Sequence, residues 1–146
     1  MTIPDRRLPD GTPLPALGLG TWRMGERADA RQAEILAVRE ALRMGYRLID
    51  TAEMYGEGGA ENMLGDALKQ AFAAGEVQRE AITLVSKVYP HHASTRGVVE
   101  ACERSLRRLK LDRIDLYLLH WRGEYALSRS EEPPSELQSR EVISYA

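Results

Sequence analysis

The stretch DTAEMYGEGG, residues 50–59, follows directly on the strand-like run YRLI at 46–49. This stretch places the Asp50 carboxylate at the end of a strand and the Tyr55 phenol in a glycine-rich turn. In proteins built on parallel sheets, the chemistry is carried by strand ends and by the loops that follow them. We therefore expect partners for these two groups at the other strand ends.

Three further apolar runs lead into residues of this kind. They are ALGLG at 16–20, ITLV at 82–85 and IDLYLL at 114–119, and they precede Thr21 and Trp22, Lys87 and Tyr89, and His120 and Trp121. The carboxyl ends of parallel strands lie at one edge of a sheet, so side chains far apart in sequence can converge there.

A carboxylate, a phenol, an ammonium and an imidazole together can transfer a proton. A phenol with an ordinary pKa of about 10 is a poor acid at neutral pH. A nearby ammonium stabilises the phenolate, a carboxylate can hold that ammonium, and an imidazole can orient a carbonyl oxygen. Such a site protonates an oxygen whose carbon receives a hydride, and the candidate catalytic residues are Asp50, Tyr55, Lys87 and His120.

Each of these residues also has a purely structural interpretation. Asp50 could cap backbone N–H groups of its loop, and Tyr55 could be a packing residue. Lys87 could be a solvated charge and His120 a satisfied core histidine. The catalytic interpretation rests on their joint occurrence at four corresponding strand ends.

The elements that must position these residues alternate between strand and helix. We expect strands at 16–20, fully buried, and at 46–50, 82–85 and 114–120. With helices between them, this order predicts a parallel sheet with right-handed crossovers. A hairpin turning at Asp10-Gly11 is expected before the first strand.

Three helices are expected between the strands. The first is capped by Asp29 and ends at Gly45, the second ends before Gly75, and the third begins at Ser94. The start of the second helix is expected to be solvated and acidic, with Glu53, Glu57 and Glu61.

Composition excludes several classes of protein. The chain has 146 residues, 43% of them hydrophobic, and 20 basic against 22 acidic residues give a net charge of −2, which speaks against nucleic-acid and membrane-surface partners. A single cysteine, Cys102, fits a reducing compartment. The N-terminus has no signal-peptide core, and no apolar run reaches the roughly 20 residues of a membrane span. A cytoplasmic protein is expected.

Competing motifs are weak. Residues 18–20, GLG, lack the third glycine of a dinucleotide-binding fingerprint. His91 and His92 have no Cys or carboxylate partners at ligand spacing, so no metal site is expected. Cys102 falls on an apolar helix stripe and is expected to be a small buried hydrophobe.

Four motifs, in this order and spacing, resemble the aldo-keto reductases: GLGTW, LIDTAEMYGEGGAE, LVSKVYP and LDRIDLYLLHW. The resemblance covers residues 8–127, and its wording is most similar to bacterial members that reduce methylglyoxal and other small aldehydes. The family fold is a (β/α)8 barrel, and the family reduces aldehydes and ketones with NADPH, usually without a metal.

The resemblance also implies roles for individual residues. Tyr55 would be the general acid, with Lys87 making it more acidic and His120 orienting the substrate carbonyl. Asp50 would pair with Lys87 and approach the nicotinamide ribose. Thr21 and Trp22 would line the nicotinamide end of the cofactor site, and the aromatic walls of the substrate pocket would be Trp22, Tyr89 and Trp121.

The chain departs from the family in length, because a complete barrel takes about 250 residues. Residues 1–127 are expected to form the N-terminal half of the barrel, left incomplete. Residues 128–146, polar and rich in helix breakers at their start, are expected to be a non-family tail, disordered or produced by truncation or a frameshift. Such a chain is expected to be inactive. The alternatives are a non-catalytic half-barrel, a protein-interaction module and, with less support, a nucleotide-sensing subunit.

Overall fold

The computed structural model describes residues 3–123, so the expectations for residues 128–146 lie outside the described part of the chain. The chain begins with the expected antiparallel hairpin of β1 (Asp5–Arg7) and β2 (Pro13–Pro15). Gly11 has a left-handed φ of 85°, and Asp10 accepts a hydrogen bond from the Thr12 amide, which together close the turn.

The centre of the fold is a parallel sheet with the order β3-β4-β5-β6. Its strands are β3 (Gly18–Gly20), β4 (Leu48–Asp50), β5 (Thr83–Val88) and β6 (Leu116–Leu119). The expected parallel α/β architecture is thus confirmed. Within residues 3–123 the sheet stays open, with β3 and β6 as its edges, and forms no closed barrel.

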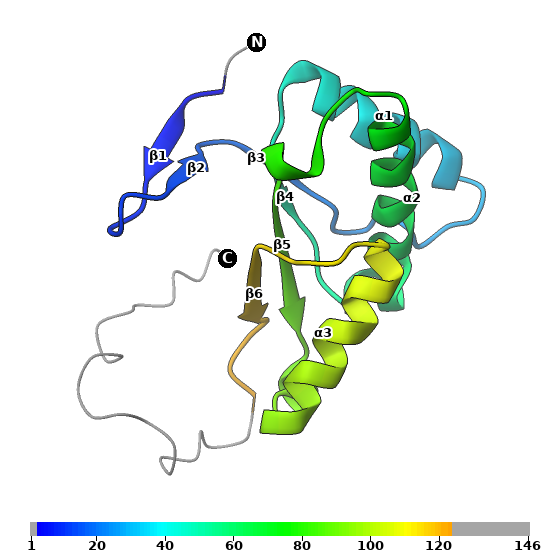
Figure 1. The fold of residues 1–146 in the computed structure, drawn as a ribbon. Coiled ribbons are helices and arrows are strands. Elements are labelled where there is room, and N and C mark those ends of the chain that lie inside the picture. Colours follow the sequence, from blue (N-terminus) through cyan, green and yellow to red (C-terminus); the bar gives the residue numbers. More distant parts are fainter. Residues whose placement is uncertain (1–2, 124–146) are drawn as a thin grey trace.

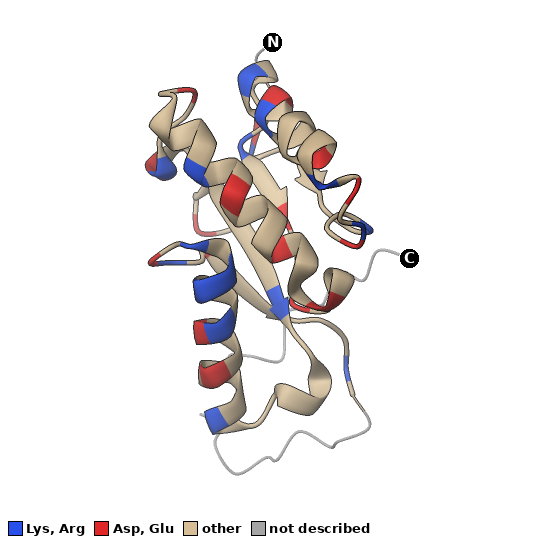
Figure 2. Ribbon diagram, turned by 90° about the vertical axis from the view of Figure 1, so that its right-hand side faces the viewer, with Lys and Arg blue, Asp and Glu red and all other residues tan. Residues whose placement is uncertain are grey.

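Three helices, α1 (Arg31–Met44), α2 (Gly59–Ala73) and α3 (Thr95–Leu109), cover one face of this sheet (Figures 1 and 2). Short 3-10 turns precede α2, β5 and α3, at Tyr55–Gly58, Arg79–Ala81 and Pro90–His92. None of the helices among the described residues is long and apolar enough to cross a membrane.

Three of the four helix ends expected from the sequence are confirmed, among them the end of α2 at Ala73, before Gly75. Gly45 ends α1 in a left-handed conformation, and the Ser94 side chain caps α3 by accepting a hydrogen bond from the Gly97 amide. The prediction that Asp29 caps α1 is wrong. Its carboxylate is held by Arg27 at 2.5 Å, and α1 begins after Ala30 without a side-chain cap.

The hydrophobic core lies between the sheet and the helices. Its fully buried members come from α1, α2, β4, β5 and the end of α3, and include Val38, Leu42, Ile49, Met63, Leu64, Leu84 and Leu109. Burying aliphatic side chains of this size stabilises a fold by about 1.5–3 kcal/mol each. The core therefore fixes the positions of β4 and β5, the two central strands.

Alternation along the strands divides their side chains between two faces. Ile49 and Leu84 are register partners and point into the core. Asp50 and its register partner Val85 therefore face the side that the helices leave open, and so does Lys87, two residues further along β5. The two candidate catalytic groups of the central strands share this open face.

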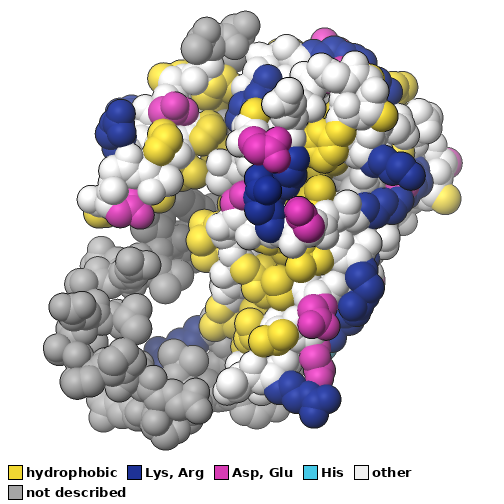
Figure 3. Space-filling model, viewed as in Figure 1, with side chains coloured by type: hydrophobic (Ala, Val, Ile, Leu, Met, Phe, Trp, Pro, Cys, Tyr) yellow, Lys and Arg dark blue, Asp and Glu magenta, His cyan; other side chains and the backbone are white. Residues whose placement is uncertain are grey.

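The edge strands are more exposed than the sequence suggests. The expectation that the first strand is fully buried is wrong, because Gly18 and Gly20 are exposed and Leu19 is only partly buried. On the opposite edge Leu116 and Leu118 remain exposed, and Figure 3 shows apolar side chains gathered over this part of the sheet. Leu116 and Leu118 are the register partners of Val85 and Lys87, so their side chains lie on the face of the sheet that the helices leave open.

Candidate active site

The Lys87 ammonium occupies the centre of the candidate site. Its Nζ donates to Asp50 Oδ2 at 2.7 Å and to the Thr51 carbonyl at 2.9 Å. Both acceptors lie at the carboxyl end of β4, the neighbour of β5, so the parallel pairing of the two strands brings these groups together. The Lys87 side chain is largely buried and is held in one position by two hydrogen bonds.

Tyr55 approaches the same ammonium from the turn that follows β4. Its hydroxyl oxygen lies 3.3 Å from Lys87 Nζ, and the ammonium lies 5.0 Å from the centre of the ring. Gly56, Glu57 and Gly58 all have positive φ, between 52° and 86°, and this left-handed stretch turns the chain from β4 into α2. Glu57 pays a steric cost of about 1–2 kcal/mol in this conformation, which the surrounding contacts must offset.

His120 closes the site from the end of β6. Its backbone amide donates to the Val88 carbonyl, and its ring meets the Tyr55 ring edge-on with 5.5 Å between centroids. Burial first, and then the charge of Lys87, lower the pKa of His120, so the imidazole is neutral at pH 7. Its Nδ1 is buried without a hydrogen-bond partner among the described residues. The other ring nitrogen is therefore the one available for a hydrogen bond to a ligand.

The structure places the two residues after β3 differently. Thr21 is fully buried, and its hydroxyl donates to Thr51 Oγ1 at 2.8 Å and lies 3.2 Å from the Asp50 carbonyl. Thr21 thus holds the backbone that carries Asp50. Trp22 is 71% exposed and makes no ring contact with another described residue. The ring contacts that join Tyr55, Tyr89, His120 and Trp121 therefore do not include Trp22.

Two further aromatic residues form a wall next to His120. The Trp121 ring lies 5.0 Å from the His120 ring and 6.0 Å from the Tyr89 ring. Burial, and then the Glu57 carboxylate, raise the pKa of the Tyr89 phenol, so this residue stays protonated and donates to Glu57 at 3.2 Å. The site thus has a polar centre and an aromatic margin.

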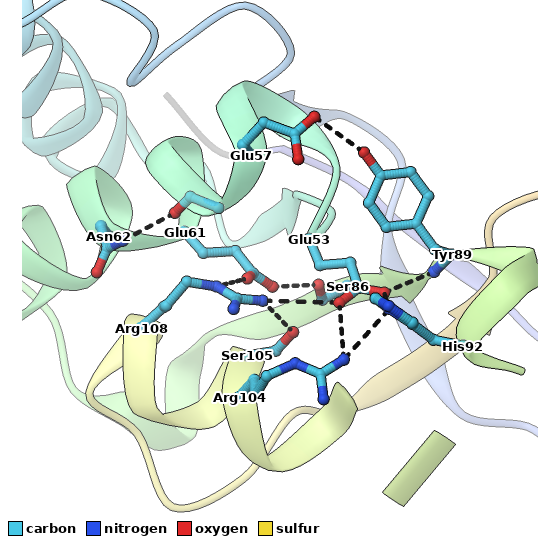
Figure 4. A network of polar contacts seen from close by, with 11 residues as sticks. Glu53, Glu57, Glu61, Asn62, Ser86, Tyr89, His92, Arg104, Ser105 and Arg108 are labelled. Atoms are coloured by element: carbon cyan, nitrogen blue, oxygen red, sulfur yellow. Dashed lines mark hydrogen bonds and ion pairs between the residues drawn. The ribbon is translucent and has the colours of Figure 1, made fainter. Parts of the chain in front are cut away.

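The interpretation of the acidic residues as a solvated helix start is wrong for two of the three. Glu53 is only 5% exposed, and its Oε1 accepts hydrogen bonds from the Tyr89 amide at 2.7 Å and from His92 Nδ1 at 3.0 Å (Figure 4). Burial alone would raise the pKa of Glu53, but these hydrogen bonds and the charge of Arg104 outweigh it, and the pKa is lowered.

Glu61 is fully buried beneath the site. It accepts hydrogen bonds from Ser86 Oγ at 2.7 Å and from Arg108 Nε at 2.6 Å (Figure 4). Ser86 points to the helix face of β5, immediately before Lys87 on the open face. The sequence does contain a signal for this burial, because Glu61 has helical spacing with the core residues Leu64 and Leu68.

The described residues offer few competing sites. A hollow of about 450 Å³ is lined by Gly65, Lys69, Phe72 and residues 109–111, and none of the candidate catalytic residues borders it. Between residues 3 and 123 no three His, Cys, Asp or Glu side chains gather in a group that could hold a metal ion. The Lys87 cluster is therefore the strongest candidate for chemistry in this part of the chain.

Fold and site together define an α/β protein in which Asp50, Tyr55, Lys87 and His120 gather at the carboxyl edge of a parallel sheet. The sequence model of the Aldo/keto reductase family matches residues 16–138, most of the chain. The chain therefore belongs to the aldo/keto reductase family.

Individual relatives agree with this assignment. Methylglyoxal reductase YeaE of Escherichia coli (strain K12) is 50% identical over 117 residues, which are 80% of this chain and 39% of that protein. A solved aldo/keto reductase from Klebsiella pneumoniae, in complex with NADP and acetate, has a TM-score of 0.70 and 50% identity, covering 79% of this chain and 38% of its own. A second, in complex with NADPH, has a TM-score of 0.73 and 47% identity, covering 86% and 42%. The chain thus spans about two fifths of the length of these relatives.

Proposed function

We propose that this chain carries the proton-transfer part of an NADPH-dependent site that reduces aldehydes and ketones to alcohols. The observation that carries the proposal is the position of one ammonium, on Lys87, between the Asp50 carboxylate and the Tyr55 hydroxyl. Membership of a family of oxidoreductases supports the same chemistry.

In the proposed reaction the Tyr55 phenol gives its proton to the carbonyl oxygen of the substrate. Lys87 stabilises the phenolate left behind, and Asp50 holds the ammonium in place. Neutral His120 donates a hydrogen bond to the same carbonyl oxygen, which orients it toward Tyr55. Bound NADPH supplies the hydride that the carbonyl carbon receives, so that carbon and oxygen together gain the two hydrogens of an alcohol.

The residues present fit the nicotinamide end of such a cofactor. Asp50 is half-exposed, and its Oδ1 has no partner among the described residues, so it can accept a hydrogen bond from a ribose hydroxyl. Next to it on β3, the Cα of Gly20 faces open space, because a Cβ there would meet no atom within 4 Å. Asp50 would therefore hold this end of NADPH, with exposed Trp22 as a second contact, whereas the fully buried Thr21 would act only by holding the Asp50 backbone.

The proposed substrates are small aldehydes such as methylglyoxal. The rings of Tyr89 and Trp121 lie next to His120 and would form one wall of the substrate site, to which Trp22, after β3, would add a further aromatic side chain. The 50% identity to a methylglyoxal reductase supports this class. We propose a cytoplasmic location on the balanced charge and the single cysteine.

A chimera tests the proposal. Residues 3–123 of this chain replace the matching segment of the E. coli methylglyoxal reductase, and NADPH oxidation is followed at 340 nm with methylglyoxal. We expect aldehyde-dependent oxidation within about tenfold of the parent enzyme. A folded chimera that binds NADPH but oxidises none of it would contradict the proposal. We expect far slower turnover from the 146-residue chain alone, because both sheet edges of its described part are open.

The open edge supports a second candidate, a non-catalytic half-barrel that binds another protein. Leu116, Leu118 and Leu119 are each more than one third exposed on the edge strand β6, and unpaired edge strands readily pair with other chains. Titration of the purified 146-residue chain with NADPH, followed by nucleotide fluorescence, separates the two candidates. Micromolar binding by the monomer argues for the reductase site, whereas self-association without nucleotide binding argues for the interaction module.

A further inference from the structure

Arg108 of helix α3 contacts the turn that carries Tyr55 on both sides of the turn (Figure 4). Its Nε donates to Glu61 Oε2 at 2.6 Å, just after the turn, and its Nη2 lies 3.9 Å from Glu53 Oε2, just before it. One guanidinium therefore bridges two buried carboxylates whose positions in the chain enclose Tyr55.

The stem of the Arg108 side chain also contacts the turn itself. A Cβ added to Gly58 would lie 2.7 Å from Arg108 Cδ and 2.8 Å from its Nε, so the arginine passes directly over the backbone of this residue. Gly58 is the last of three consecutive residues with positive φ. The arginine therefore contacts the turn before, at and after its left-handed stretch.

The same two glutamates also form hydrogen bonds with β5, the strand that carries Lys87. Glu61 also accepts from Ser86, the residue before Lys87 on β5, and the Glu53 amide donates to the Lys87 carbonyl at 3.3 Å. Arg108 itself is held on α3, where its Nη2 donates to Ser105 Oγ at 3.2 Å. The core-facing network thus links α3 to the segments that carry both Tyr55 and Lys87.

We propose that Arg108 is a positioning residue, which fixes the Tyr55 turn so that the phenol hydroxyl stays beside Lys87 and His120. Its catalytic meaning rests on the proposed function, in which Tyr55 donates the proton. A guanidinium suits this task because its planar fork can contact both carboxylates at once, whereas a lysine ammonium is a compact point charge.

A simpler role is possible for the same residue, namely to balance the negative charge of buried Glu61. The two roles differ in what a lysine can do. An ammonium at position 108 would supply the balancing charge but could not bridge Glu53 and Glu61 while lying over Gly58. Arg108→Lys therefore separates positioning from charge balance.

The test uses the full 146-residue chain with labelled tyrosine and histidine and measures the nuclear Overhauser effect between the rings of Tyr55 and His120. Tyr55→Phe assigns the signal, and circular dichroism with cooperative unfolding checks that each variant is folded. We expect at least a threefold weaker signal in Arg108→Met and in Arg108→Lys. The control Arg107→Met removes an arginine that is 67% exposed on the same helix and should leave the signal unchanged.

A signal of full strength in folded Arg108→Lys would overturn the proposal, because charge balance alone would then hold Tyr55. If Arg108→Met does not fold, Arg108→Lys decides by the same criterion. The measurement needs no turnover, so it can fail while the reductase proposal stands, and it can succeed if that proposal fails.

Discussion

The ammonium nitrogen of Lys87 lies 3.3 Å from the hydroxyl oxygen of Tyr55, although the two residues come from different elements of the chain. Lys87 belongs to the central strand β5, which the core fixes, and Tyr55 belongs to a strained turn after β4. One partner is held by the sheet and the other by contacts from the helix layer.

Replacing Lys87 by methionine should abolish the proposed chemistry while keeping the shape of the side chain. The phenolate of Tyr55 would lose its stabilising charge, and Asp50 would lose its partner at 2.7 Å. Because general acid catalysis contributes about 10²–10⁴-fold, kcat of the chimera with methylglyoxal should fall by at least about 100-fold. Lys69→Met, which removes an exposed lysine of α2, is the control and should leave kcat unchanged. An unchanged rate in Lys87→Met would contradict the role of the ammonium.

Gly58→Ala should destabilise the fold more than Gly11→Ala, although both glycines have nearly the same φ, 86° and 85°. Forcing a Cβ into this conformation costs about 1–2 kcal/mol at either position. At Gly11 the new methyl group meets nothing within 4 Å, whereas at Gly58 it meets Arg108 Cδ at 2.7 Å. We expect a further loss of about 1–3 kcal/mol at Gly58 from this overpacking, measured by urea unfolding. Equal losses would show that Arg108 does not press on the turn.

The free energy of unfolding should fall at acid pH as Glu76 becomes protonated. Glu76 follows the end of α2 and binds two arginines of α1. Hydrogen bonds from Arg39 and Arg43, both at 2.5 Å, outweigh burial and lower the pKa of Glu76 from 4.5 to about 2. A carboxylate with a depressed folded-state pKa stabilises fully above its unfolded-state pKa, and this contribution disappears as pH falls through the folded-state value.

Glu76→Gln isolates this contribution. The difference in free energy of unfolding between the parent chain and the variant should be constant above about pH 5 and should shrink between 4.5 and 2. Urea unfolding at a series of pH values measures it. A difference that stays constant down to pH 2 would contradict the depressed pKa.

The sequence predicted the grouping of the residues on the open face of the sheet, because the order of parallel strands determines where their ends lie. In a parallel sheet the carboxyl ends of β4, β5 and β6 must lie along one edge, so Asp50, Lys87 and His120, at or just after these ends, could be grouped without coordinates. Turn chemistry at Asp10-Gly11 and the cap at Ser94 are equally local and were equally predictable.

The network of Glu53, Glu61, Ser86 and Arg108 on the helix side of the sheet was not predicted, because its members bind residues that are remote in sequence. Glu61 meets Ser86 and Arg108, which follow it by 25 and 47 residues, and residue type alone suggested a solvated carboxylate. A buried carboxylate is tolerated only when such partners satisfy it, and no local pattern reveals them. Asp29 failed as a cap for a different, local reason, because Arg27, two residues before it, binds its carboxylate.

The most direct test of the central claim is the effect of Tyr55→Phe on the chimera that contains residues 3–123 of this chain. Removing one oxygen atom deletes the proposed proton donor and leaves the ring next to His120. We expect that kcat with methylglyoxal falls by at least about 100-fold while NADPH affinity changes less than about twofold. A Tyr55→Phe chimera that reduces methylglyoxal as fast as its parent would contradict it.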